Sequence, residues 1–151
     1  MGIIWKYLDK RGAAASAVRD YGNMEHIISH TDGRIRAAYQ KMAGIRSPQP
    51  DGMPHTQNPR AAEDRIIRGL GDVDVLLERY RQAAEYMAWF RPAWEALAED
   101  ERYVLAEFYR DGRRGAVERI CGHFQIERSS AYNKKNRALQ RLAVLLYGES
   151  E

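Results

Sequence analysis

Five polar residues that could exchange hydrogen bonds with a nucleic acid fall within seven consecutive positions near the end of the chain. They are Arg128, Ser129, Ser130, Asn133 and Lys134. Arginine can grip guanine with two parallel hydrogen bonds, and asparagine can do the same with adenine. Serine hydroxyls and lysine ammonium groups hold phosphates and fix the register of a protein on a duplex. These residue types therefore suit contact with double-stranded DNA.

Two short helices joined by a tight turn are the elements expected to position these side chains. The first has Val117, Ile120, Cys121 and Phe124 on its apolar face, and Ile126 would plug the break that follows. The second runs from about residue 128 to 146, with apolar residues at its back and Gly148 as its stop. This is the helix-turn-helix layout, in which the first turns of the second helix enter the major groove.

Two residues depart from the usual pattern of this layout. Gln125 stands where a left-handed backbone favours glycine. Lys135 stands where a leucine is expected on the packed face of the second helix. Both departures concern the detailed geometry more than the fold.

Further candidate DNA contacts extend this set. Arg137 lies on the same helix, and Tyr132 could either pack or reach DNA. Arg113 and Arg114, in the turn DGRRG at 111–115, could hold phosphates or be solvated. Residues 110–141 carry nine basic and three acidic residues, a net charge of +6 against +3 for the whole chain. Such a localised positive surface favours a polyanion as partner, although a solvated charged face would give the same count.

The stretches EALAEDERYVLAEFYRDG and VERICGHFQIERSSAYNKKNRALQRLAVLLYG resemble the C-terminal DNA-binding domain of sigma factors, region four. They are more similar still to phage and prophage regulators of the ArpU and RinA kind. The resemblance covers about the last third of the chain and is carried by Glu101-Arg102, Val104-Leu105, Phe108-Tyr109, Ile126 to Ser130 and Ala138 to Leu142. A loop containing Asp51-Gly52-Met53-Pro54, before a long charged helix, is also similar to those regulators.

The resemblance implies a transcriptional regulator of phage late or packaging genes that binds promoter-region DNA. It also implies a cytoplasmic location at the nucleoid of a bacterial host, with host RNA polymerase as a further partner. The single cysteine, Cys121, excludes an internal disulfide and fits a reducing cytoplasm. No apolar run is long enough to span a bilayer, and the N-terminus lacks the features of a signal peptide.

The sequence as a whole predicts an all-α fold, because sustained apolar alternation typical of strands is absent. We expect a short helix or arm at 1–22, a helical hairpin at 23–91 with a Pro-rich loop at 46–60, and the DNA-binding domain at 92–148. Pro92 should end or kink the second hairpin helix. Gly69 and Gly71 interrupt that helix and should each cost roughly 1 kcal/mol against alanine.

The hairpin is predicted from two apolar stripes with steps of four and three residues, which keep one face of a helix apolar. The stripes could pack within one coiled-coil-like chain or join two chains as a homodimer. The first comprises Met24, Ile28, Thr31, Ile35, Ala38, Met42 and Ile45, and the second comprises Ile66, Leu70, Val73, Leu77, Tyr80, Ala84 and Met87.

No residues with the spacing of a known catalytic or cofactor-binding motif are found, so we expect neither an enzyme nor a cofactor. His26 and His30 could share a metal ion, but Asp32 is not on their face and no third ligand follows at a convincing spacing. We therefore expect no metal site.

Two other functions fit the same pattern. A DNA-packaging protein like the small terminases also combines a helix-turn-helix with oligomerising helices, but usually places the DNA-binding part first. A helical protein-interaction module would not bind DNA at all.

Overall fold

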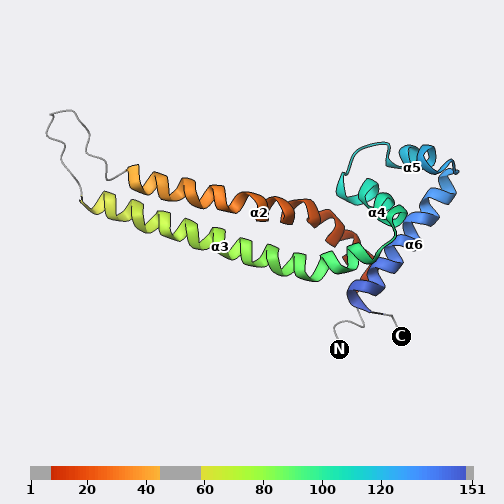
Figure 1. Cartoon of the computed structure of the whole chain (residues 1–151), viewed down its shortest axis with the longest axis horizontal. Helices are drawn as coiled ribbons and strands as arrows, with labels where there is room; N and C mark the ends of the chain where they lie inside the picture. Colours follow the sequence, from red (N-terminus) through yellow and green to blue (C-terminus); the bar gives the residue numbers. More distant parts are fainter. Residues whose placement is uncertain (1–7, 45–58, 149–151) are drawn as a thin grey trace. The chain divides into compact units, whose positions relative to one another are not determined.

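The structure is a computed structural model that describes residues 8–44 and 59–148. No strand occurs in these two ranges, so the prediction of an all-α fold is confirmed. Residues 1–7 and most of the predicted Pro-rich loop lie outside the described residues. The elements, drawn in Figure 1, are α2 (Lys10–Gly44), α3 (Pro59–Ala96), α4 (Glu99–Leu105), the π-helical turn η1 (Ala106–Arg110), α5 (Ala116–Phe124) and α6 (Arg128–Tyr147).

The chain divides into two compact units. The first unit comprises residues 1–25 and 85–151, and the second comprises residues 26–84. The helices α2 and α3 each contribute residues to both units. Within the second unit they run antiparallel and side by side (Figure 1).

The start of α2 corrects the expectation of a separate helix or arm at residues 1–22. α2 begins at Lys10 and continues without interruption to Gly44. Alanine has the highest helix propensity, and Ala13–Ala15 with Ala17 supply a strong local preference for helix. Four residues of this stretch are also buried, which fixes the helix by packing: Ala14, Ala15, Ala17 and Val18.

Pro92 does not end α3, which continues to Ala96. A proline inside a helix removes one backbone hydrogen bond and costs about 3 kcal/mol. The residues around it offset this cost, since Phe90, Ala93 and Trp94 are all buried. Tertiary packing therefore stabilises α3 beyond Pro92, the residue at which the sequence predicts that the helix ends or kinks.

The main core of the first unit joins α2, α3, α4 and α6. Its largest fully buried side chains are Phe90, Leu105, Leu142 and Val18. The ring of Tyr21 lies 5.5 Å from that of Phe90 and 6.0 Å from that of Trp94, measured between centroids. Ala138 and Ala143 have small side chains, which let α6 pack closely against the other helices of this core. This core holds the rear half of α6 in place.

A second, smaller core in the same unit packs α5 against the front half of α6. It contains Val104, Val117, Ile120 and Ala131, all buried. Phe108, Phe124 and Ile126 pack against it while partly exposed, and the single cysteine lies at its edge. Because the two cores contact α6 at different heights, the helix is fixed along most of its length.

The second unit has little fully buried apolar surface. In the described part of α2, every member of the predicted stripe is at least half-buried, while Ile45 lies outside the described residues. Thr31 is buried, and its hydroxyl donates to the carbonyl of Ile27. The α2 stripe is therefore confirmed wherever the structure describes it.

The predicted α3 stripe is wrong at three positions. Leu70, Leu77 and Tyr80 are 46%, 50% and 42% exposed. The face turned toward α2 in the second unit keeps Ile66 and Val73 of the predicted stripe but elsewhere lies one residue earlier. It includes small side chains, to which an apolar pattern gives too little weight. Its members include Ala62, Ile66, Gly69, Val73, Leu76 and Ala83.

Gly69 is a point of close approach and not an interruption of α3. A methyl group at this position would lie 2.6 Å from Sδ and 2.7 Å from Cγ of Met42. Glycine here makes room for the Met42 side chain. Gly71, by contrast, has no neighbouring atom within 4 Å of such a methyl group.

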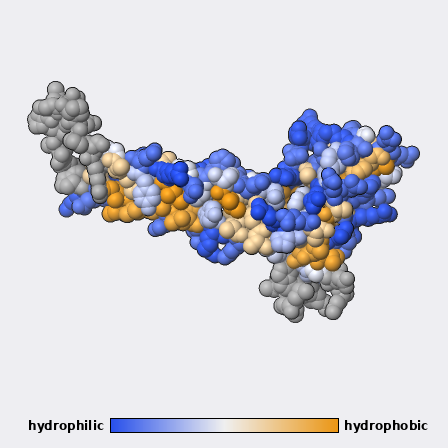
Figure 2. Space-filling model, in the orientation of Figure 1, coloured by the Kyte–Doolittle hydropathy of each residue, from blue (hydrophilic) through white to orange (hydrophobic). Residues whose placement is uncertain are grey.

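Apolar side chains are exposed on α3 in the second unit. The residues are Ile67, Leu70, Val75, Leu77 and Tyr80. Figure 2 shows that hydrophobic residues, in orange, gather along one side of the helix pair of this unit.

Candidate nucleic-acid interface

The turn between α5 and α6 has the geometry that its sequence predicts. α5 ends at Phe124, and its C-cap residue Gln125 has φ of 55° and ψ of 52°, in the left-handed region. Among the described residues, Gln125 is the one non-glycine residue with a positive φ. The N–H of Ile126 donates to the carbonyl of Cys121 at 3.1 Å, and the Ile126 side chain packs against the smaller core. The expectation that Ile126 plugs this turn is confirmed.

α6 presents one polar face to solvent. Exposed residues follow each other along its first three turns: Arg128, Ser129, Tyr132, Asn133, Asn136 and Arg137. The opposite face is buried at Ala131, Ala138, Leu139 and Leu142. Leu145 is 43% exposed and so departs from the expected packing of the back of this helix.

Four of these exposed side chains make no hydrogen bond or ion pair with the described part of the chain. They are Ser129, Asn133, Asn136 and Arg137. Their donors and acceptors are satisfied by solvent and are therefore available to a ligand. The first three turns of α6 thus carry a hydroxyl, two amides and a guanidinium on one face.

Asn136 is absent from the residues that sequence reasoning selected. It lies three residues after Asn133 and four after Tyr132, so it shares their face of the helix. That spacing is the signal that could have found it.

The other basic residues of α6 are engaged with neighbours. Arg128 contacts Glu118 of α5 at 3.2 Å in an exposed ion pair. The ammonium of Lys134 lies 4.5 Å from the ring centroid of Phe124. Ser130 and Lys134 are half-buried, so they lie at the edge of the face.

The surroundings of Lys135 explain why a lysine can stand where a leucine is expected. Its ammonium lies 5.3 Å from the Phe108 ring centroid and 5.5 Å from that of Tyr132, and its side chain is half-buried. A lysine stem can cover apolar surface while its charge stays near solvent and an aromatic face. Tyr132 itself packs on Phe108 at 5.8 Å between centroids and stays 39% exposed.

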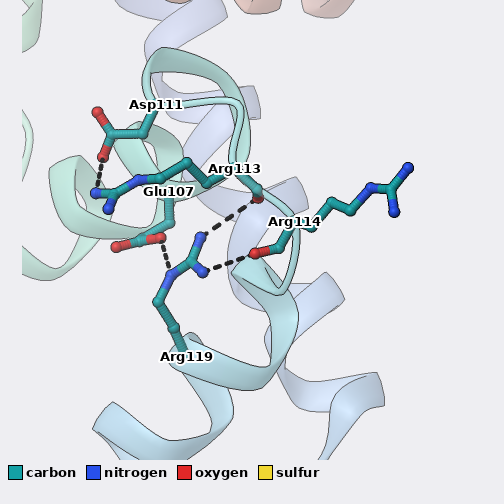
Figure 3. A network of polar contacts seen from close by, with 5 residues as sticks. All are labelled: Glu107, Asp111, Arg113, Arg114 and Arg119. Atoms are coloured by element: carbon teal, nitrogen blue, oxygen red, sulfur yellow. Dashed lines mark hydrogen bonds and ion pairs between the residues drawn. The ribbon is translucent and has the colours of Figure 1, made fainter.

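A partly buried ion pair braces the turn that carries Arg113 and Arg114. Glu107, 9% exposed in η1, accepts a hydrogen bond of 2.7 Å from Nε of Arg119 in α5. The other two nitrogens of that guanidinium donate to the carbonyls of Arg114 at 2.8 Å and Arg113 at 3.3 Å. Figure 3 shows that one guanidinium joins η1, the turn and α5.

The two arginines of the turn differ in their surroundings. Arg113 lies 3.9 Å from the carboxylate of Asp111 and is largely exposed. The side chain of Arg114 extends away from the braced network (Figure 3) and makes no hydrogen bond or ion pair with the described residues. The brace fixes the backbone of the turn and leaves the Arg114 charge free for a ligand.

The base of α6 is joined to α4 by a second ion pair. Arg141 donates to the carboxylate of Glu101, and Glu101 also accepts a 3.0 Å hydrogen bond from the N–H of Ala98 at the start of α4. Glu99 and Asp100 accompany it in the first turn, where acidic groups suit the helix dipole. Glu101 therefore caps the start of α4 and holds α6 through Arg141 at the same time.

The described residues contain no group of three His, Cys, Asp or Glu side chains placed to hold a metal ion. None of the described helices is at once long and apolar enough to cross a membrane.

Comparisons with known proteins add no identification. No family model matches the chain, and no curated protein or solved structure matches it.

Proposed function

We propose that this protein is a sequence-specific DNA-binding transcriptional regulator with α6 as its recognition helix. The observation that supports this most strongly is the polar face of α6. Ser129, Asn133, Asn136 and Arg137 are exposed and have no hydrogen-bond partner in the described part of the chain, on a helix whose other face is buried in two cores. A rigid helix that presents amides and a guanidinium matches the donors and acceptors of the major groove.

In this proposal Asn133 and Arg137 read base edges together with Arg128. The ion pair of Arg128 with Glu118 is exposed at both ends and is worth less than about 1 kcal/mol. A guanine that offers two acceptors can replace it at little cost. Glu118→Gln should then strengthen DNA binding, because it removes the competing carboxylate.

Phosphate contacts in this proposal come from the turn before α5 and from the edge of α6. Arg114 has no hydrogen-bond or ion-pair partner among the described residues, and Ser129, Ser130 and Lys134 lie near the start of α6. The Arg119 brace holds the Arg114 backbone in place, so less conformational entropy is lost when the turn meets a phosphate. Arg119 is a positioning residue in this scheme.

The proposed regulator has a phage context because of the sequence resemblance to ArpU- and RinA-like proteins. RNA polymerase of the host is a proposed partner on the same ground. A homodimer is also part of the proposal, since two recognition helices would read two half-sites. The exposed apolar residues of α3 are where a second chain could pack.

Fluorescence anisotropy with labelled duplexes that tile the DNA around the protein's own gene would test the proposal. The titration is made at two salt concentrations. We expect tight binding to one tile that weakens steeply with salt, because phosphate contacts release condensed counterions.

Variants distinguish base reading from phosphate contact. Asn133→Ala and Arg137→Ala should each cost about 1–3 kcal/mol on the preferred tile and reduce its advantage over the others. Arg114→Ala should weaken binding to all tiles alike and lower the salt slope by roughly one. Arg65→Ala, an exposed arginine of the second unit, removes the same charge and serves as the control.

Other outcomes would support different functions. Absence of binding at low salt would leave the helical protein-interaction module. Specific binding by a ring of many subunits would favour a packaging protein like the small terminases. If Asn133→Ala, Arg137→Ala and Arg65→Ala behaved alike, α6 would not be the reading helix.

A further inference from the structure

A pocket in the second unit, between α2 and α3, is lined by basic and titratable side chains. It has a volume of about 180 Å³ and is lined by His26, Ile27, His30, Thr31, Arg34, Leu76 and Arg79. No carboxylate is among these residues. Neither guanidinium has a hydrogen bond or ion pair to the described part of the chain. The pocket therefore combines two uncompensated positive charges with two imidazoles over an apolar floor.

The two imidazoles form a stacked pair. Their ring centroids are 3.9 Å apart. Nδ1 of His30 lies 3.0 Å from the carbonyl oxygen of His26. Nδ1 also lies 2.9 Å from Oγ of Ser29, whose hydroxyl donates to the same carbonyl. Nδ1 is therefore occupied by contacts within α2, which leaves Nε2 for a ligand. Nε2 can accept from a P–OH group when the ring is neutral and can donate to a P–O⁻ group when the ring is charged.

The chemistry of the lining selects an anion over a metal ion. Paired histidines at a spacing of four can bind transition metals, but structural zinc sites use four protein ligands. Arg34 and Arg79 would repel a divalent cation, and no carboxylate or thiolate lines the pocket to complete a ligand set. A guanidinium, in contrast, matches the geometry of phosphate oxygens.

The size of the pocket limits the ligand. Pockets for drug-sized molecules occupy about 300–1,000 Å³, whereas a buried water needs only about 10–15 Å³. The pocket lies between these values and suits a single phosphate group.

We propose that His26, His30, Arg34 and Arg79 form a phosphate-binding site, separate from the proposed DNA-reading face of α6. The phosphate could be free inorganic phosphate or a phosphate of a nucleic-acid backbone. The proposal stands on the pocket alone and does not depend on DNA recognition by α6.

The test is NMR of the full-length protein with ¹⁵N-labelled backbone and ¹³C-labelled histidine rings. Inorganic phosphate is titrated at constant pH, and chloride keeps the ionic strength constant. We expect saturable shifts at the four proposed ligands and at Thr31. Arg34→Gln and Arg79→Gln should each weaken binding roughly ten-fold or more, since each removes charge-assisted hydrogen bonds.

Matched controls separate a site from general charge screening. Arg36→Gln on α2 and Arg68→Gln on α3 remove the same charge from exposed positions that do not line the pocket. They should leave the phosphate affinity unchanged within about two-fold. Equal losses in all four variants, or shifts that rise linearly and spread over many exposed arginines, would overturn the proposal.

A second titration with a short duplex DNA identifies the source of the phosphate. Shifts at His26 and His30 that vanish in Arg79→Gln would support the site with a nucleic-acid phosphate as its ligand. If only inorganic phosphate gave these shifts, the site would be supported with free phosphate as its ligand. No response of the two histidine rings to either probe would refute the site and leave the proposal for α6 untouched.

Discussion

Gln125 holds the left-handed backbone conformation that ends α5, with φ of 55°. A residue with a Cβ atom pays about 1–2 kcal/mol in this conformation, and glycine does not. Glycine costs about 0.5–1 kcal/mol more conformational entropy on folding. We therefore expect Gln125→Gly to stabilise the protein by roughly 0.5–1 kcal/mol, measured by chemical unfolding.

The control for this substitution is Gln40→Gly. Gln40 is exposed inside α2, where glycine lowers helix propensity. We expect it to destabilise the protein by about 0.5–1 kcal/mol. If both substitutions changed the free energy of unfolding in the same direction, the strain assigned to Gln125 would be absent.

Tyr86 gives stability that depends on pH. Its hydroxyl donates to the carbonyl of Ala17, and burial raises the pKa of this phenol, with a smaller contribution from the charge of Asp20. The neutral phenol is therefore favoured in the folded state, while an unfolded tyrosine releases its proton near pH 10. This stability is fully present below about pH 10 and is lost as the pH rises above that value.

Tyr86→Phe should separate the two effects. It should lower stability near neutral pH by about 1 kcal/mol, because a hydrogen bond is lost. It should also reduce the further loss above about pH 10, measured by urea unfolding at each pH. Tyr39→Phe, at an exposed site, is the control and should leave the alkaline loss unchanged. An alkaline loss equal to that of the wild type in Tyr86→Phe would contradict this account.

At the scale of the elements, the two glycines of α3 should respond in opposite ways to alanine. Gly71→Ala adds a methyl group in open space and should stabilise the helix by about 0.5–1 kcal/mol. Gly69→Ala should not stabilise the protein, because its methyl group would displace the Met42 side chain. Thermal unfolding followed by circular dichroism measures both.

A double substitution tests the cause. In a Met42→Ala background, Gly69→Ala should become stabilising, because the space is then free. If Gly69→Ala were as favourable as Gly71→Ala in the natural sequence, the close approach would carry no energetic weight.

The elements around α6 could be predicted from sequence because their signals are local. The turn DGRRG, the apolar face of α5, the plug at Ile126 and the stop at Gly148 each follow from residues that are neighbours in the chain. The long helices were harder to predict. The beginning of α2 at Lys10 and the passage of α3 through Pro92 depend on packing between residues far apart in sequence.

The candidate site was predicted in composition but not in its contacts. The residue types on α6 identify the exposed face, but the partner of each basic residue depends on the tertiary fold. Arg119 appeared in the sequence only as one of nine basic residues, and its role as a brace depends on the position of Glu107 one helix earlier. Asn136 could have been predicted from the sequence, because its spacing from Tyr132 and Asn133 places it on the same face of α6.

At the scale of the whole molecule, the two units should differ in local stability. Of the buried apolar residues in the described part of the chain, only Val73 and Ala83 belong to the second unit. Regions with few buried contacts open with lower free energy. We expect amides at 30–40 to exchange at least roughly ten-fold faster than those at 138–142 of α6, measured by native-state hydrogen exchange. Equal protection would mean that the two units open together.

The first unit is discontinuous in the chain, since residues 26–84 separate its two segments. Closing a flexible loop of that length costs roughly 3–4 kcal/mol in chain entropy, by the logarithmic dependence on loop length. When α2 and α3 pair within the second unit, much of this cost is met by local contacts between the two helices. The second unit would then form early in folding. Its paired helices would bring Val18 and Phe90 close together before the main core forms.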